Sequence, residues 1–471
     1  MKQITIDIET ASDENIKDCG VYRYAESECF DLLLISYAVD NGPVATCDIA
    51  NGETLPDDVR NALTDKTVIK KAFHVNFERI CLSVYLRRKY PEMLDFKDST
   101  GSYLDPVSWQ CDMIHCRYLG MLSSLDDMGR LLRLKEKKMA EGKELIRFFC
   151  TLHQEADGSI LFHDKSDAPK KWEKFKAYNR RDVEVELKIQ RYLSEFPVPE
   201  FVWEEFYIDQ EINDRGILVD TSFAKKAVEL DGQVKKALLP KLKELTGLDN
   251  PNSPVQMKEW LMCRGMETDT LDKKFMQKIS GSAPEKVQEV LRLYQQLSRS
   301  SVQKYTTMLR VVCADGRTRG MFSFYGANRT GRFAGRLIQL QNLPQNHLDD
   351  LAELKEQIRT GEFDTIKENY DDVPDVLSQL IRTAFIPPEG KKYVVADFSA
   401  IEARVLVWLA DEKWRMQAFA NGEDIYCASA SKMFGVPVEK NGTNGHLRQK
   451  GKIAELACGY GGSIGAIKAM G

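Results

Sequence analysis

The first strand-forming stretch of the chain places two acids inside an apolar segment. Residues 3–9 read QITIDIE, and the two-residue period of a strand puts Asp7 and Glu9 on one face. A buried carboxylate is costly unless something compensates its charge, and a metal ion does so well. An exposed strand face is the simpler explanation of an isolated Asp-x-Glu pair, so other segments must decide between the two readings.

Two further segments supply acids that suit the same site. Tyr178 and Asp182 are four residues apart in a predicted helix, so phenol and carboxylate share a face. Residues 72–82, AFHVNFERICL, place Glu78 at the start of an apolar helix. Four carboxylates and a tyrosine suit two hard cations about 4 Å apart, which activate water and hold a phosphate.

The pattern of apolar residues divides the chain into parts. Up to residue 195, strand and helix signals alternate, which predicts an α/β domain. The strands are expected at 3–9 and 31–39, and the helices at 77–90 and 171–193. The two prolines of 195–201 indicate a linker.

Residues 202–312 are predicted to be almost wholly helical. One helix in this region is expected to begin after Ser253, which caps it, with Pro254 in its first turn and Gly265 at its end. Beyond this region the apolar run at 391–399, KKYVVADFS, predicts a strand that ends near Asp397. An acid at a strand end suits a metal ion, and it equally suits the cap of the next helix.

The C-terminal stretch from residue 447 predicts a helix with a functional stripe. Arg448, Lys452, Leu456 and Tyr460 recur every four residues and fall on one face. The cations would neutralise phosphates and the tyrosine would contact a base, whereas a solvated helix face is the simpler reading of an Arg-Lys pair alone. The four identities Arg448, Lys452, Tyr460 and Gly461 at this spacing have a chance of roughly one in a hundred in such a chain.

Charge is distributed unevenly, although the net charge is only −5. Residues 299–336 contain eight cations and one acid, interleaved with aromatics, whereas 349–375 contain ten acids and three cations. The basic stretch predicts a track for polyphosphate, with a solvated loop-rich face as the open alternative. The acidic stretch is expected to form an exposed helical insertion.

Cysteines and hydropathy indicate the compartment. The eleven cysteines form no CxxC pair, which predicts free thiols in a reducing cytoplasm. The N-terminus, MKQITIDIET, does not resemble a signal peptide, and no apolar run is long enough for a membrane span. We therefore expect a cytoplasmic protein without membrane partners.

Three of these segments together resemble the motifs of proofreading 3′–5′ exonucleases of the RNase H-like fold. They are Asp7 with Glu9, Glu78, and Tyr178 with Asp182, in this order. The resemblance implies that the four carboxylates hold two Mg²⁺ ions, with Mn²⁺ as a substitute, and that Tyr178 orients the attacking water. The second motif departs from the family, which usually has Asn and Asp where this chain has His74 and Glu78, and this leaves open how active the site is.

The later segments resemble family A DNA polymerases. Residues 393–410 resemble motif A, the terminal helix resembles motif B, 329–345 resembles the primer-template motif, and 207–220 resembles the entry to the thumb. The resemblance implies DNA primer-template and deoxynucleoside triphosphates as partners. A cytoplasmic setting in a bacterial or phage-infected cell follows from it.

Roles for individual residues follow from this second resemblance. Asp397 and the carbonyl of Phe398 would bind the catalytic Mg²⁺ pair, and Glu402 would exclude a ribose 2′-hydroxyl. Arg448 and Lys452 would hold the triphosphate, with Lys452 as a candidate proton donor, and Tyr460 would pack beside the nascent base pair. Leu456 stands where the family commonly has an aromatic residue. Contacts to DNA would come from Thr330, Arg332, Arg336, Gln341 and Asn342, with Arg332 at the primer terminus.

The implied architecture is α/β + α. We expect an RNase H-like 3′–5′ exonuclease domain over 1–195, a helical thumb over 196–312, a partial palm with motif A over 313–420 and partial fingers with motif B over 421–471. We expect no 5′-nuclease domain before the exonuclease, as in the phage enzymes that the chain resembles. The His-Asp-Glu of motif C does not occur, and FHDKS at 162–166 is the nearest string.

The missing motif leaves three hypotheses. The chain is the N-terminal portion of a polymerase truncated within the fingers, which would polymerise only with a C-terminal fragment that carries motif C. Alternatively, it is a stand-alone 3′–5′ exonuclease with a DNA-binding C-terminal region, or a non-catalytic DNA-binding remnant. The first hypothesis predicts no templated synthesis by these 471 residues alone.

Overall fold

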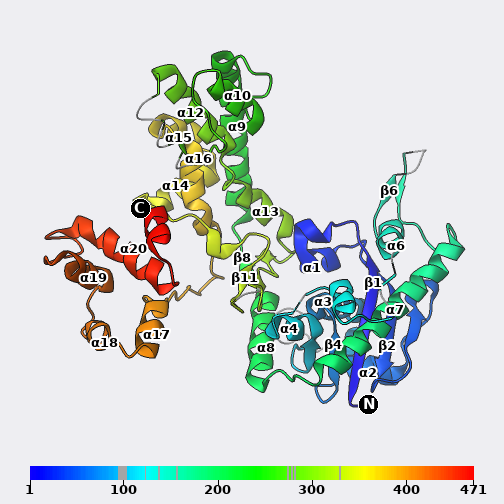
Figure 1. Ribbon diagram of the computed structural model, residues 1–471. Coiled ribbons are helices and arrows are strands. Elements are labelled where there is room, and N and C mark those ends of the chain that lie inside the picture. The colour runs from blue at the N-terminus through cyan, green and yellow to red at the C-terminus, as the bar shows by residue number, and fades with distance from the viewer. Residues whose placement is uncertain are drawn as a thin grey trace. The chain divides into compact units, whose positions relative to one another are not determined.

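The computed structural model divides the chain into two compact units, Met1–Glu389 and Gly390–Gly471. It describes residues 1–470 except 94–102, 122, 136–137, 140, 155–157, 273–274, 277–278, 280–282 and 328–329. Figure 1 shows the chain coloured from its N-terminus to its C-terminus.

The first unit begins with a mixed five-stranded sheet in the order β3-β2-β1-β4-β5. Its strands are β1 (Gln3–Ala11), β2 (Asp31–Val39), β3 (Ala45–Asp48), β4 (Ile69–Ala72) and β5 (Trp109–Cys111). β2 is antiparallel to both β1 and β3, whereas β4 is parallel to β1 and β5 to β4. Both strands predicted in this region are confirmed.

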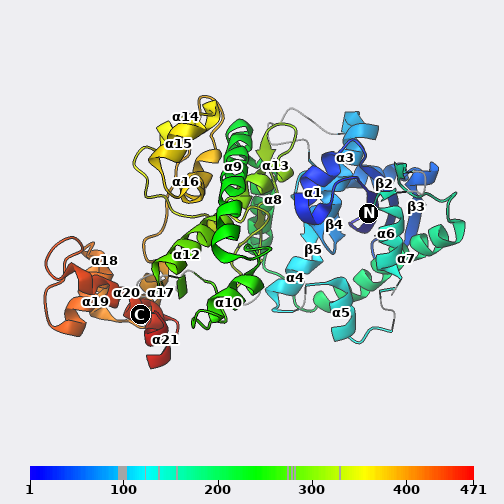
Figure 2. The ribbon, with the colours of Figure 1, turned by 90° about the horizontal axis from the view of Figure 1, so that it is seen from above.

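The central strand β1 is covered on both faces. Ile4, Ile6 and Ile8 enter the main apolar core, to which α1 (Ile16–Glu26) and α3 (Val75–Lys89) also contribute. The opposite face meets α7 (Pro169–Leu193), where Thr5 Oγ1 donates to Gln190 Oε1 over 3.0 Å. Figure 2 shows α3 and α7 on different sides of the strands. Strand periodicity therefore places Asp7 and Glu9 toward α7, away from the apolar core.

Shorter elements complete this α/β part. They are α2 (Asp57–Thr64), α4 (Asp112–Tyr118), α5 (Leu125–Leu131), α6 (Gly142–Phe149), β6 (His153–Gln154) and β7 (Ile160–Leu161), with single turns of 3₁₀ helix at Ile49–Asn51 and Pro91–Met93. The predicted linker contains the irregular residues 197–199, after which α8 (Glu200–Arg215) begins.

The following region is helical, as predicted. Its helices are α9 (Thr221–Thr246), α10 (Pro254–Met262), α12 (Glu285–Ser298) and α13 (Gln303–Val311), and a short pair joins β8 (Ile217–Leu218) to β9 (Arg317–Thr318). Ser253 caps α10 by accepting from the backbone N–H of Gln256. The helix ends at Met262, three residues earlier than Gly265, because Cys263 already closes its last turn.

The acidic stretch is helical but is not an exposed insertion, so this expectation is wrong. It forms α14 (Leu351–Thr360), α15 (Phe363–Asn369) and the start of α16 (Val373–Leu380), followed by a 3₁₀ turn at Ile381–Ala384. Leu354, Ile358, Phe363 and Ile366 are buried in one core with residues of α9. Amphipathic periodicity, rather than charge content, decides which face of these helices is covered.

The predicted strand at 391–399 is also wrong. These residues have no regular secondary structure, and the side chains of Val394 and Val395 are 85% and 90% exposed. A strand needs a partner to satisfy its backbone groups, and none of the described strands pairs with this segment.

The second unit contains five helices in its described residues. They are α17 (Ile401–Leu409), α18 (Lys413–Ala420), α19 (Ile425–Phe434), α20 (Arg448–Gly459) and α21 (Ile464–Met470), with a 3₁₀ turn at Gly445–Leu447. α19 and α20 approach closely at Gly451, where a Cβ would lie 2.1 Å from the carbonyl oxygen of Tyr426. Because α20 begins at Arg448 and includes Lys452, the helix predicted to carry these two residues is confirmed.

All eleven cysteines are free thiols, as expected, and eight of them are buried. In the part of the chain that the structure describes, no helix combines the length and apolarity that crossing a bilayer requires.

Candidate active sites

An acid cluster forms where β1, α3 and α7 meet. β1 supplies Asp7 and Glu9, the first turn of α3 supplies Glu78, and α7 supplies Tyr178 and Asp182. All of these residues except Asp7 are buried from solvent. The structure thus brings together the five residues that the sequence predicts for one site.

The carboxyl groups of this cluster are poorly solvated and repel one another. Burial, followed by the charge of Asp182, raises the pKa of Asp7 to about 8. Burial and then Asp7 raise the pKa values of Glu9 and Glu78 well above their ordinary range. Groups in this state favour an added cation, because it would stabilise their charged forms.

Lys138 supplies a positive charge that the sequence reading missed. Its Nζ lies 2.5 Å from Asp182 Oδ2 and 4.9 Å from the centre of the Tyr178 ring. Its charge lowers the pKa values of Asp7 and Glu9, against the larger effect of burial. Lys138 lies in an irregular, lysine-rich segment between α5 and α6, whose composition indicates only a solvated loop.

The remaining polar contacts fit a site for hard cations. Asn179 Nδ2 donates to Asp7 Oδ2 over 2.6 Å. Glu78 Oε2 and Asp182 Oδ1 are buried oxygens without a hydrogen-bond partner, and such oxygens are ligands that Mg²⁺ accepts. Among the described residues, no three Asp, Glu, His or Cys side chains are grouped closely enough to hold a metal ion as they stand, and the Lys138 ammonium lies by Asp182 instead.

A second pair of buried acids lies on α4 and α7. Gln190 Nε2 donates to Asp112 Oδ2 over 2.7 Å and to Glu186 Oε1 over 3.1 Å. Burial raises the pKa values of both acids. Glu186 follows Asp182 by four residues on α7. This spacing could have predicted from the sequence that the two side chains lie on the same face of the helix.

His74 occupies the position before the first residue of α3, and its side chain does not cap the helix. Burial lowers its pKa to about 4, and the charges of Arg336 and Arg117 contribute in the same direction. His74 is therefore neutral near pH 7.

The predicted DNA-contacting residues lie on one irregular segment of the first unit. Thr330, Arg332, Arg336, Gln341 and Asn342 are exposed, around the hairpin of β10 (Phe322–Ser323) and β11 (Ala334–Gly335) and the 3₁₀ turn Leu340–Asn342. Gly331 has a φ of +66°, and a Cβ there would lie 2.7 Å from the ring of Tyr325. The turn that carries Arg332 therefore requires glycine on both grounds.

Several cations of the basic stretch are paired with acids. Arg299 binds Asp375 at 2.5 Å and Asp372 at 2.9 Å, and Arg319 pairs with Asp315 at 2.6 Å. Arg310 lies 4.0 Å from Asp18, and Arg329 lies outside the described residues. Fewer cations of residues 299–336 are therefore available to bind phosphate than the number of charges in the sequence predicts.

The second unit has a cavity of about 900 Å³. Five residues of the predicted polymerase site line it, namely Asp397, Phe398, Glu402, Leu456 and Tyr460. The Tyr460 hydroxyl donates to the Glu402 carboxylate, which joins α17 to the end of α20. Glu455, which was not predicted, fixes α20 by accepting from Arg415 over 2.8 Å.

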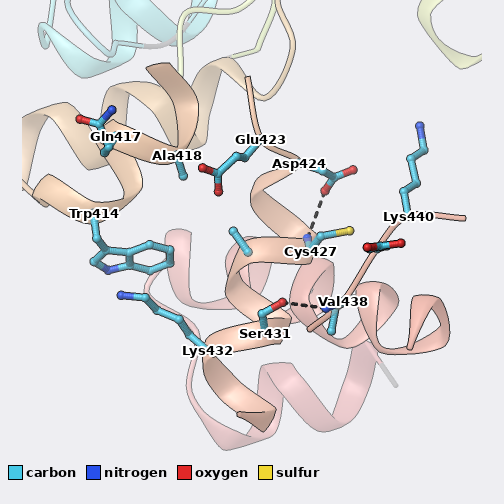
Figure 3. Close-up of a pocket in the computed structure, with 12 residues that line it drawn as sticks. Trp414, Gln417, Ala418, Glu423, Asp424, Cys427, Ser431, Lys432, Val438 and Lys440 are labelled. Carbon is cyan, nitrogen blue, oxygen red and sulfur yellow. Dashed lines mark hydrogen bonds between the residues drawn. The ribbon is translucent and has the colours of Figure 1, made fainter. Parts of the chain in front are cut away.

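The two phosphate-binding candidates do not line this cavity. Arg448 Nε donates to Asp424 Oδ2 over 2.8 Å, whereas Lys452 forms no hydrogen bond or ion pair with any described residue. Asp424 also accepts from the backbone N–H of Cys427 and lines a second cavity of about 680 Å³, shown in Figure 3. Lys432 lies over the ring of Trp414 in that cavity, 3.9 Å from its centre.

The described residues of the second unit do not complete a two-metal site. Asp397 lies in the exposed irregular segment, and no group of three ligating side chains is found around it. Glu402, the other acid at this cavity that was predicted, is hydrogen-bonded to Tyr460. A bound Mg²⁺ pair would need at least one further carboxylate.

Comparisons with known proteins give a family match for the C-terminal half of the chain and similar proteins for its whole length. The profile of DNA polymerase family A matches residues 222–469. The DNA polymerase of Bacillus phage SP02 is 44% identical over all of this chain and 71% of its own length, and DNA polymerase I of Rhizobium leguminosarum is 39% identical over 22% of this chain and 10% of its own length. In structure, the POL domain of Pol1 from M. smegmatis, in complex with DNA primer-template and dNTP, aligns with a TM-score of 0.56 at 17% identity, covering 99% of this chain and 71% of that one.

Proposed function

The chain belongs to DNA polymerase family A, and from this we propose that it combines a 3′–5′ proofreading exonuclease with the motif A and motif B part of a phage-type polymerase. The observation that carries the exonuclease is the convergence of Asp7, Glu9, Glu78, Tyr178 and Asp182 from three elements. The mixed sheet, with acids on its central strand and helices on both faces, supports an RNase H-like domain over 1–195. The thumb, palm and fingers would then be 196–312, 313–420 and 421–471.

In the proposed exonuclease, the carboxylates of Asp7, Glu9, Glu78 and Asp182 would hold two Mg²⁺ ions, and the substrate would be a terminal phosphodiester of DNA. When bound, these ions stabilise the negative charge that develops on the phosphate. Tyr178 lies one helical turn before Asp182 on α7, and burial raises the pKa of its phenol, so the hydroxyl keeps its proton and would orient the attacking water. Asn179 fixes the position of Asp7 through its amide.

In the proposed polymerase part, Glu402 and Tyr460 shape the sugar pocket while Lys452 and Arg448 bind the triphosphate. Lys452 is free to do so, but Arg448 must first exchange Asp424 for a phosphate. Asp397 and the Phe398 carbonyl supply one side of the metal site. We propose that templated synthesis needs a second carboxylate from outside these 471 residues, such as that of a fragment with the His-Asp-Glu motif.

Hydrolysis of a 5′-labelled single-stranded oligonucleotide tests the exonuclease. With Mg²⁺ or Mn²⁺, the chain should release nucleotides from the 3′ end. Asp7→Ala or Asp182→Ala should lower the rate by at least about a thousandfold, because the ligands of both ions are disrupted. Asp397→Ala is the matched control, since it removes an acid of the second unit and should leave hydrolysis unchanged. Equal rates for all four proteins would refute the assignment.

A further inference from the structure

The end of α4 contacts the β10–β11 hairpin of the primer-template segment. Arg117 Nη1 donates to Ser323 Oγ over 3.2 Å, and the rings of Tyr118 and Tyr325 lie 5.8 Å apart. Tyr325 is also the ring against which Gly331 packs. These contacts join the proposed exonuclease domain directly to the turn that carries Arg332.

Two arginines contact the same hairpin at this junction: Arg117 donates to Ser323, and the backbone N–H of Arg336 donates to the carbonyl oxygen of Met321, two residues before Ser323, over 2.8 Å. Burial and then the charge of Arg336 lower the pKa of Arg117, and both charges add to the effect of burial in lowering the pKa of His74. Among the described residues neither arginine forms an ion pair with an acid, unlike Arg299 and Arg319. Arg117 Nε is moreover buried and lacks a hydrogen-bond partner. Holding two like charges together in this way is unfavourable until an anion compensates them.

We propose that Arg117 and Arg336 form a binding site for a backbone phosphate of DNA. A guanidinium presents paired N–H donors that match phosphate oxygens, and at this junction the Arg336 side chain is exposed and that of Arg117 is partly exposed. The proposal rests on the proposed function, because DNA is the polyanion that such a chain would handle.

The location of the site indicates which part of the DNA it holds. Arg336 directly follows β11 in the primer-template segment, whereas His74 lies four residues before Glu78 of the acid cluster. The arginine pair therefore lies between the segment proposed to bind primer-template and the cluster proposed to cut the 3′ end. A single strand that reaches the cluster would be held at this phosphate.

The test is the salt dependence of DNA binding by the full chain. Fluorescence anisotropy of a labelled single-stranded oligonucleotide, measured in EDTA to prevent hydrolysis, gives the affinity at a series of NaCl concentrations. Arg117→Gln and Arg336→Gln should each weaken binding several-fold and reduce the slope of log affinity against log salt by about 0.7. The double variant should lose little more slope than either single variant, because both residues share one phosphate.

Two controls separate a phosphate contact from a structural role. Arg117→Lys keeps the charge and should recover most of the salt slope, whereas Arg359→Gln, on α14 and paired with Glu356 at 3.3 Å, should change neither affinity nor slope. Natively folded Arg117→Gln and Arg336→Gln variants that bind with unchanged affinity and slope would overturn the proposal. If the wild-type chain instead binds no DNA and hydrolyses none, the proposed function itself has failed.

Discussion

Lys138 places a positive charge beside buried carboxyl groups whose pKa values are raised by burial and by their mutual repulsion. Its ammonium contacts Asp182 and also acts on Asp7 and Glu9. A bound Mg²⁺ pair would take over this role, so the lysine and the metal ions compensate the same charges. The stability of the metal-free chain should therefore depend on Lys138 more than the stability of the metal-bound chain does.

Thermal unfolding of a Lys138→Met variant measures that dependence. In EDTA at pH 8 the variant should lose about 1–3 kcal/mol of stability, because the acids lose their cation and recover only partly by binding protons. Added Mg²⁺ should then raise the Tm of the variant more than that of the wild type. Lys135→Met is the matched control from the same segment, and equal behaviour of the two variants would contradict this role.

His74 makes stability depend on pH with a defined sign. Its pKa is about 4 in the folded chain and about 6.5 when unfolded, so between these values the unfolded chain binds the extra proton. Stability from this group is therefore complete above pH 6.5 and falls as the pH falls toward 4. His74→Asn, which removes the titrating group, should gain about 1–2 kcal/mol relative to wild type between pH 7 and pH 5.

Urea unfolding at the two pH values checks this prediction. The acid cluster titrates in both proteins, so the difference between them isolates His74. A difference in stability that is the same at pH 7 and pH 5 would show that His74 does not change its protonation on folding.

At the scale of elements, a buried ion pair connects α3 to α8. Arg79 is fully buried and donates from Nη1 to Asp214 Oδ2 over 2.8 Å and from Nη2 to Asp214 Oδ1 over 2.7 Å. Tyr22 donates to the same carboxylate over 2.6 Å, and Leu104 accepts from Arg79 through its carbonyl oxygen. This pair ties the helix that carries Glu78 to the first helix of the following region.

Removing one partner of this pair should be far more costly than removing both. Arg79→Met leaves Asp214 buried without its partner and should cost about 3–5 kcal/mol in urea unfolding, whereas the double variant with Asp214→Leu should recover much of this loss. The exposed pair of Arg130 and Asp126 is the control, and Arg130→Gln should cost at most about 1 kcal/mol. A double variant no more stable than Arg79→Met would contradict this account.

The sequence predicts those features that depend on residues within a single element, and it does not predict those that depend on packing between elements. The period of β1 and the four-residue spacing on α7 predict four of the five acid-cluster residues, and the position of Glu78 at the start of an apolar helix predicts the fifth, because each of these is a local property of one element. Lys138 and Arg117 could not be predicted in the same way, since their roles depend on packing between distant segments. The prediction of a strand at 391–399 is wrong for the same reason. Its apolar residues are typical of a strand, but a strand also needs a neighbouring strand to pair with, and this depends on distant segments.

At the scale of the whole molecule, the two units differ in how complete their chemistry is. The first contains four carboxylates and a tyrosine for the proposed exonuclease, with oxygens left free for metal ions. The second gathers a proposed sugar pocket and Lys452, but the predicted acid that shares its cavity with Asp397, Glu402, is hydrogen-bonded to Tyr460. These 471 residues alone are therefore expected to shorten DNA and not to extend it.

A primer-extension assay measures whether these 471 residues shorten or extend DNA. The chain is incubated with Mg²⁺, all four deoxynucleoside triphosphates and a primer-template whose primer is labelled at its 5′ end. The account predicts that the labelled primer only becomes shorter, that Asp7→Ala abolishes the shortening, and that Asp397→Ala has no effect on it. A primer that becomes longer in a reaction abolished by Asp397→Ala, or shortening that survives Asp7→Ala, would contradict the account.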